Sequence, residues 1–155
     1  MATKKPIEIH LTHLDLAKAK KALTLRPGTV DFIHAENVVQ YLNPKERASF
    51  FNECHRVLKK GGRLQTSVPH WCASVAYGDM AVQFPPVVES FFFHLNAGWR
   101  EANKPVFKGL TCDFDSTWGY GMHPAIVSRN QEYQQNAIQF WKEAAQSLVA
   151  TSVKR

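Results

Sequence analysis

Hydrophobic and polar residues alternate in a short segment near the start of the chain, and a run rich in β-forming residues follows a turn further on, so both predict strands. Residues 6–11 (PIEIHL) alternate, so we expect a strand near 7–11 with one buried face. A Pro-Gly turn at 27–28 precedes the run 30–34 (VDFIH), which is the second predicted strand. Between them, residues 14–25 place leucine, alanine and lysine on one helical stripe, which predicts only a short helix.

The clearest periodic signal is a helix followed by another strand. Asn43 and Glu46 are spaced as a capping box at the start of this helix. Its apolar stripe consists of Phe50, Phe51, Cys54, Val57 and Leu58. We expect the helix to span 44–59 and to end at the Gly61-Gly62 pair, with a strand at 63–68 after it. Strand, helix and strand in this order form the crossover unit of a parallel sheet.

The second half of the chain is richer in aromatic residues and less regular. Residues 87–99 are predicted to be helical, and a strand leading into a loop is expected at 111–118. An amphipathic helix is predicted at 130–145, before a final strand at 147–153 that pairs antiparallel with the earlier one. These elements predict an α/β fold with a mostly parallel sheet and an antiparallel C-terminal pair, in a single domain over residues 1–155.

Composition places the chain among ordinary globular proteins. Its 155 residues are 45% hydrophobic and 21% charged, which favours one folded domain over disorder. No apolar run is long enough for a transmembrane helix, and the basic start leads into no signal sequence, so we expect a cytoplasmic protein. Three widely spaced cysteines predict neither a disulfide framework nor a zinc motif. His10 and His13 are three residues apart on a strand and face opposite sides, so we expect no metal site.

The net charge of +6 favours contact with polyanions, which makes a nucleic-acid-binding module one hypothesis. The basic residues are, however, spread along the chain, as is typical of solvated helix faces. Arg100 and Lys104 lie near Trp99 and Phe107, a mixture that suits stacking on bases. Aromatic residues at this density are more typical of a packed core.

Three segments carry the most specific motif of the chain: 30–34 (VDFIH), 38–42 (VVQYL) and 51–62 (FNECHRVLKKGG). They resemble the second half of a class I S-adenosylmethionine (SAM)-dependent methyltransferase, in which the phrase R-V-L-K-P-G-G separates a helix from the fifth strand. The remainder, through Val153-Lys154-Arg155, is similar to a subgroup frequent in tailed-phage and environmental genomes. The resemblance implies a reduced, Rossmann-like sheet of the methyltransferase type.

The Gly-rich turn of that family has no counterpart in this chain. The family holds the carboxypropyl group of SAM on this turn, after its first strand, and the ribose on an acidic residue. Here the first glycine is Gly28, and Glu8 or Asp15 can replace only the acidic residue. A Glu-His pair of the subgroup is Gln40-Tyr41 here, and a histidine suited to acid-base chemistry is Val82. SAM is therefore the cofactor that the resemblance implies, but we do not expect the isolated chain to bind it.

Any retained ligand site should lie over the carboxyl ends of the strands at 30–34 and 63–68, because open α/β sheets bind ligands there. The candidate contact residues are His34, Glu36, Asn37 and His70. Nothing in the sequence assigns a catalytic residue among them.

These observations favour a degenerate methyltransferase relative that is non-catalytic alone and acts through protein–protein assembly. The alternatives are an active SAM-dependent methyltransferase completed by a partner or a second copy, and the nucleic-acid-binding module. The resemblance implies that the strand at 30–34 lacks a neighbour unless the strand at 7–11 takes that place. Residues 91–93 and Trp99 add further apolar surface that so small a sheet is not expected to cover. We therefore expect a homo-oligomer, or a subunit of a larger assembly, that buries at least ~800 Å² per partner.

Overall fold

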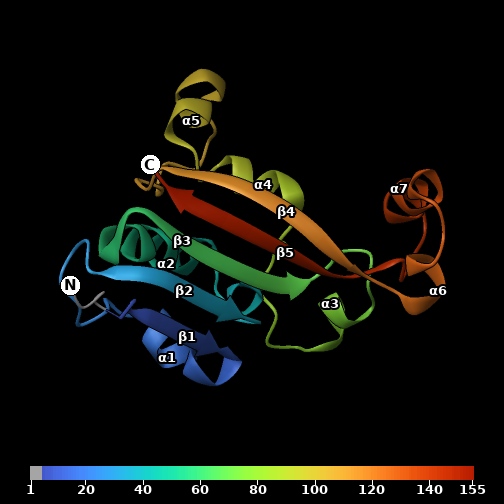
Figure 1. Ribbon diagram of the computed structural model, residues 1–155, viewed down its shortest axis with the longest axis horizontal. Coiled ribbons are helices and arrows are strands. Elements are labelled where there is room, and N and C mark those ends of the chain that lie inside the picture. The colour runs from blue at the N-terminus through green and yellow to red at the C-terminus, as the bar shows by residue number, and fades with distance from the viewer. Residues whose placement is uncertain (1–4) are drawn as a thin grey trace.

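The centre of the protein is a five-stranded sheet with the strand order β1-β2-β3-β5-β4 (Figure 1). The computed structural model describes residues 5–155. The strands are β1 (Glu8–Thr12), β2 (Val30–Glu36), β3 (Leu58–Pro69), β4 (Phe114–Met122) and β5 (Ala145–Lys154). The first three are parallel, and β5 is antiparallel to both β3 and β4, so four strands point one way. The predicted α/β fold, with its antiparallel C-terminal pair, is confirmed.

Short helices connect these strands. They are α1 (Leu16–Ala19), α2 (Pro44–Val57), α3 (Val75–Gly78), α4 (Glu89–Phe93), α5 (Ala97–Asn103), α6 (Pro124–Val127) and α7 (Gln131–Phe140), with 3-10 turns η1 (His13–Asp15) and η2 (Val39–Tyr41). None of the helices in residues 5–155 has the length and apolar character that a membrane span requires.

The capping box of α2 is confirmed, but the predicted end of this helix is wrong. Asn43 Oδ1 accepts a hydrogen bond from Glu46 N at 3.0 Å, and Asn43 N donates to Glu46 Oε2 at 2.9 Å. The helix ends at Val57, and Leu58 is already extended and pairs with Val30 on β2. The predicted glycine stop instead lies in an irregular stretch of β3, because burial of Leu58 takes the chain into the sheet before the glycines are reached.

Three predicted boundaries in the second half also differ from the structure. The single helix expected at 87–99 is two helices, because the Asn96 side chain caps the start of α5. Helix α7 ends at Phe140 rather than 145, and a left-handed residue, Glu143 (φ 65°), turns the chain into β5. Strand β4 extends to Met122, where a loop was expected, because it pairs with β5 along most of its length.

The strand at 7–11 takes the place beside β2 that the family resemblance leaves open. Its structural counterpart β1 is an edge strand, paired in parallel with β2 from Glu8↔Phe32 to Thr12↔Glu36. Strands β1, β2 and β3 therefore follow one another in a single direction across the sheet. Right-handed crossovers between parallel strands then place α1 and α2 on the same face. In Figure 1, α2 lies behind the sheet.

The hydrophobic core consequently fills one face of the sheet. Leu11, Ile33 and Leu64 point into it and meet Phe51 and Cys54 of α2. The opposite face, called the open face below, consists of three rows of cross-strand neighbours. These rows are Glu8, Phe32, Arg63, Val153 and Asp115; His10, His34, Gln65, Thr151 and Thr117; and Thr12, Glu36, Ser67, Val149 and Gly119. Every position in them is half-buried or exposed, and most carry polar side chains, which tolerate contact with water.

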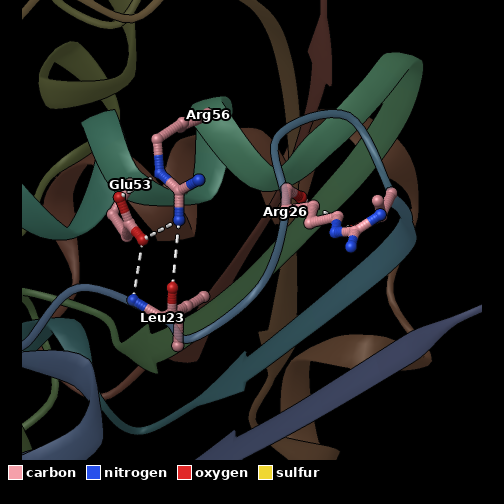
Figure 2. Close-up of polar contacts among 5 residues, drawn as sticks. Leu23, Arg26, Glu53 and Arg56 are labelled. Atoms are coloured by element: carbon pink, nitrogen blue, oxygen red, sulfur yellow. Dashed lines mark hydrogen bonds and ion pairs between the residues drawn. The ribbon is translucent and has the colours of Figure 1, made fainter.

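The segment between α1 and β2 is attached to α2 by hydrogen bonds between the Leu23 backbone and an ion pair within that helix, Glu53–Arg56. Glu53 Oε1 accepts hydrogen bonds from Leu23 N at 2.7 Å and from Arg56 Nη2 at 2.6 Å (Figure 2). The same Arg56 nitrogen donates to Leu23 O at 3.0 Å. Hydrogen bonds from Arg56 hold the pKa of the Glu53 carboxyl below its usual value. Further along, Thr29 Oγ1 donates to Arg26 O at 2.8 Å and closes the turn before β2.

Candidate functional site

Three of the four predicted contact residues lie together at the carboxyl end of β2. His34 and Glu36 are two residues apart on this strand, so both side chains belong to the open face. Asn37 follows with a left-handed φ of 53°, and its N–H donates to Ser67 O of β3 at 2.9 Å. The strand end and its first turn are thereby fixed against β3.

The fourth residue, His70, lies in a different environment. Its side chain is fully buried after the end of β3, and both ring nitrogens have partners. Nδ1 lies 3.0 Å from Cys72 Sγ, and Nε2 lies 3.0 Å from Glu89 Oε1. Because Cys72 N also donates to Nδ1, the hydrogen of the neutral ring belongs on Nε2 and is donated to Glu89. The structure therefore does not bring His70 onto the face that carries His34.

The hydrogen bond from His70 lowers the pKa of Glu89. The order thiol, imidazole and carboxylate is the one that activates cysteine nucleophiles. The sequence analysis missed this arrangement, because Glu89 is 19 residues from His70 and joins it only through α4. The His-x-Cys spacing after a predicted strand was the one signal that could have drawn attention to it.

A polar cleft of about 690 Å³ lies beside the end of β2. Asn37, Gln40, Tyr41 and Asp79 contribute to its lining. Tyr41 Oη donates to Asp79 Oδ2 at 3.0 Å, and the Ala81 amide lowers the pKa of the Asp79 carboxyl. Gln40 Oε1 is buried and has no hydrogen-bond partner among the described residues. The cleft thus keeps polar groups at the place where this type of sheet binds ligands.

The turn after β1 does not fit the carboxypropyl group of SAM. A cofactor carboxylate at this position needs free backbone amides and a backbone that it can approach closely. Here the Thr12 amide donates to Asp15 Oδ2 at 3.1 Å, and the Leu14 amide donates to Thr12 Oγ1 at 3.3 Å. The chain therefore satisfies these amides itself, and side chains stand at each position of the turn. Asp15 was a candidate for the acidic residue that contacts the ribose. Its carboxylate instead accepts hydrogen bonds from the Thr12 amide and from Lys18 Nζ.

A second cleft, of about 610 Å³, lies between the segment after β3 and the end of α7. Its aromatic lining comes from Trp71, Tyr77, Phe140 and Trp141, and Cys72 also contributes to it. We call this the aromatic cleft. Phe140 is 76% exposed and Tyr77 is 59% exposed, so the aromatic side chains of the cleft are in contact with water. Large exposed apolar patches mark interaction sites.

The apolar residues that the sequence analysis held responsible for assembly are mostly covered. Val30, Ile33 and Phe92 are buried in the core, and Phe91 packs against it. Phe93 remains exposed, with its ring 6.2 Å from that of Trp99 in a stacked arrangement. Four further exposed aromatic residues, Trp71, Tyr77, Phe140 and Trp141, line the aromatic cleft, which sequence reasoning did not identify.

Histidines and a carboxylate also gather on the open face. Glu8, His10 and His34 have ligand-type atoms that all lie within 4.8 Å of one another. His13, which the sequence analysis considered with His10, lies in the 3-10 turn after β1 and is not part of this group.

Comparisons with known proteins agree with this architecture. A family model described as a methyltransferase domain matches residues 2–66. A SAM-dependent methyltransferase from Archaeoglobus fulgidus superposes with a TM-score of 0.58 at 10% identity, over 96% of this chain and 86% of that one. A Thermotoga maritima SAM-dependent methyltransferase, described as a possible histamine N-methyltransferase, gives a TM-score of 0.53 at 12% identity, over 99% and 84% of the two chains. A comparison with curated proteins finds no match. The chain is thus a methyltransferase-like domain in its fold.

Proposed function

We propose that this chain is a degenerate methyltransferase relative that does not transfer methyl groups by itself and acts as a homodimer joined at the aromatic cleft. The observation that carries this proposal is the exposed apolar surface formed by Trp71, Tyr77, Phe140 and Trp141. Water contact with so many large apolar groups is unfavourable, and a second copy removes it. The self-capped turn after β1 supports the non-catalytic part of the proposal.

The distribution of charge supports a second copy as the occupant of the cleft. Near the cleft, Lys142 is balanced by the carboxylate of the adjacent Glu143, which accepts a hydrogen bond from Ser74 N of the cleft lining. Basic residues concentrate instead at the opposite end of the sheet, at 59–63 and 154–155. Strand β3 alone separates the two ends by ~30 Å, several times the Debye length of ~8 Å. Two copies that meet at their aromatic ends therefore avoid the repulsion that a net charge of +6 would otherwise cause.

Light scattering coupled to size-exclusion chromatography tests the assembly. We expect the wild-type chain to elute with twice its monomer mass at ~50 µM, as an interface of ~800 Å² per partner allows. Phe140→Asp should shift the chain to monomer, because it places a charge in the apolar contact. Val106→Asp is the matched control, since Val106 is 98% exposed and belongs to neither cleft. A wild-type monomer, or an equal loss of dimer in both variants, would contradict the proposal.

One observation favours an active methyltransferase completed by a partner. The polar cleft remains, and Gln40, whose buried Oε1 has no hydrogen-bond partner among residues 5–155, contributes to its lining. Calorimetry with SAM separates the two functions: the degenerate interpretation expects no heat of binding from the isolated chain. Micromolar SAM binding would support the alternative, and Glu36→Ala should then abolish it without a large cost in stability, since Glu36 is exposed at the strand end.

A further inference from the structure

Three side chains that suit a transition metal converge on the open face at the sheet edge. Glu8 and His10 are two residues apart on β1, and therefore point to the same side. His34 is the direct register partner of His10 on β2. Glu8 Oε2 lies 3.7 Å from His10 Nε2, and the two imidazole rings stack with centroids 4.3 Å apart and planes within 8°. Two adjacent strands thus present two nitrogen donors and one oxygen donor in one place.

The surroundings of this group hold one ligand firmly and leave the other two adjustable. The Phe32 ring stacks on His34 at 4.1 Å and restricts its position. The side chains of His10 and Glu8 are 65% and 48% exposed, so both can rotate at little cost. Arg63, the nearest cation in the same row, lies two strands from Glu8, or ~10 Å, and does not neutralise its carboxylate.

We propose that Glu8, His10 and His34 bind a divalent transition metal ion of the zinc type. Imidazole nitrogen with one carboxylate oxygen is a donor set that zinc prefers, whereas calcium and magnesium require oxygen ligands throughout. Bonds of ~2.1 Å in a tetrahedron place donor atoms ~3.4 Å apart. The present separations, of up to 4.8 Å, need to contract by little more than an ångström, which rotation of His10 and Glu8 supplies.

Such a site would keep an open coordination position. Three protein ligands leave a fourth tetrahedral position, and the open face lets water or a ligand atom reach it. This inference does not depend on the proposed dimer, because the aromatic cleft is formed by the segment after β3 and the end of α7, and the metal ligands are on β1 and β2.

Isothermal titration of the full chain with zinc chloride tests the site. The wild type should bind one equivalent of Zn²⁺. His10→Ala and His34→Ala should each weaken the affinity at least about tenfold, and Glu8→Gln should weaken it in the same direction. His13→Ala is the matched control, because His13 is an exposed histidine next to β1 that lies outside the group. Cys72→Ser serves as a second control against binding by the buried thiol cluster.

A structural readout accompanies the titration. In proton NMR spectra, the ring resonances of His10 and His34 should shift when Zn²⁺ is added, and those of His13 should not. Circular dichroism of each variant confirms that the fold is retained. A wild-type chain that binds no zinc would overturn the proposal, and so would affinity that is unchanged in both His10→Ala and His34→Ala.

Discussion

The three cysteines differ sharply in what surrounds their sulfur atoms. Burial raises the pKa of Cys112 to about 12 and raises that of Cys54 still further. Cys72 instead has its Sγ 3.0 Å from a ring nitrogen of His70, and it contributes to the aromatic cleft. The thiolate is the reactive form of cysteine, so the raised pKa values make Cys54 and Cys112 unreactive. Cys72 differs because a ring nitrogen that can accept its proton lies beside it.

Because the proposed dimer would cover the aromatic cleft, the reaction is measured on the folded Phe140→Asp monomer, in which we expect iodoacetamide to alkylate Cys72 at least about tenfold faster than the other two thiols at pH 8. Mass spectrometry of peptides from a time course measures the three rates. His70→Gln should slow the reaction at Cys72, because the acceptor nitrogen is lost, and the denatured chain should show no selectivity. Equal alkylation rates at the three cysteines in the folded protein would contradict a role of His70 in the reactivity of Cys72.

Arg47 is a buried cation that is held by backbone carbonyls. Its guanidinium donates to Val39 O at 3.1 Å, to Pro85 O at 2.6 Å and to Gln83 O at 2.9 Å. Burial lowers its pKa to about 10. The side chain therefore joins α2 to the segment before α4, which borders the polar cleft.

Replacing Arg47 by lysine should lower the free energy of unfolding by about 2–3 kcal/mol, because one ammonium cannot reach three carbonyls in the planar arrangement of a guanidinium. Urea denaturation followed by circular dichroism measures this change. Arg26→Lys is the control, since Arg26 is exposed, and should change stability by less than about 0.5 kcal/mol. A similarly small effect at Arg47 would show that water replaces its hydrogen bonds.

At the scale of elements, α2 has the clearest local sequence signals and the best-predicted start. Asn43 and Glu46 satisfy two backbone amides reciprocally, and Pro44 occupies the first turn. The last turn was misjudged because Leu58 is needed in the core, and its fully buried position outweighs the local preference for a glycine stop. Helix starts depend on neighbouring residues, whereas this helix end depends on a strand 28 residues earlier.

Asn43→Ala should destabilise the protein by about 1 kcal/mol, the usual cost of removing a helix N-cap. Ser49→Ala is the matched control, because Ser49 is an exposed position inside the same helix, where alanine is favourable. Thermal denaturation should therefore show a lower midpoint for the first variant only. Equal midpoints would mean that the tertiary contacts of α2 compensate for the lost cap.

At the scale of the whole molecule, protonation of carboxylates and histidines below neutral pH acts in one direction. The pKa values of Glu46, Glu53 and Glu89 are lowered in the folded state, chiefly by hydrogen bonds to Asn43, Arg56 and His70 respectively. Burial also lowers the pKa values of His55 and His94. In each case the unfolded chain binds protons more readily than the folded chain, so folding is favoured at higher pH.

Stability should therefore be greatest near neutral pH and fall as the pH is lowered. The histidines contribute to the loss below about pH 6.5 and the carboxylates below about pH 4.5, their unfolded values. Urea midpoints measured from pH 7.5 to pH 3 test this expectation. Glu53→Gln should flatten the acidic part of the curve, and Glu132→Gln, which removes an exposed carboxylate from the first turn of α7, is the matched control for the loss of one negative charge. If the free energy of unfolding rose as the pH was lowered, the pKa values of these carboxyls and histidines could not be lowered by folding.

Local patterns in the sequence were enough to predict which segments form strands or helices and which of their faces are buried. Alternation predicted β1, a β-rich run after a turn predicted β2, and the capping box predicted the start of α2, because these signals involve residues close together in the chain. The antiparallel pairing of the last strand was also predicted, and the structure confirms it. The predicted contact residues His34, Glu36 and Asn37 share one strand end for the same local reason.

Only the tertiary structure decided which distant side chains meet. His10 stands opposite His34 because of the register of β1 on β2, and a shift of one residue would put these side chains on opposite faces. Glu89 reaches His70 because α4 packs at the end of the sheet. The open face results from the strand order. Because β1, β2 and β3 follow one another across the sheet, their right-handed crossovers place α1 and α2 on the same face. Contacts of this kind join residues far apart in the chain, and the periodicity of single segments carries no information about them.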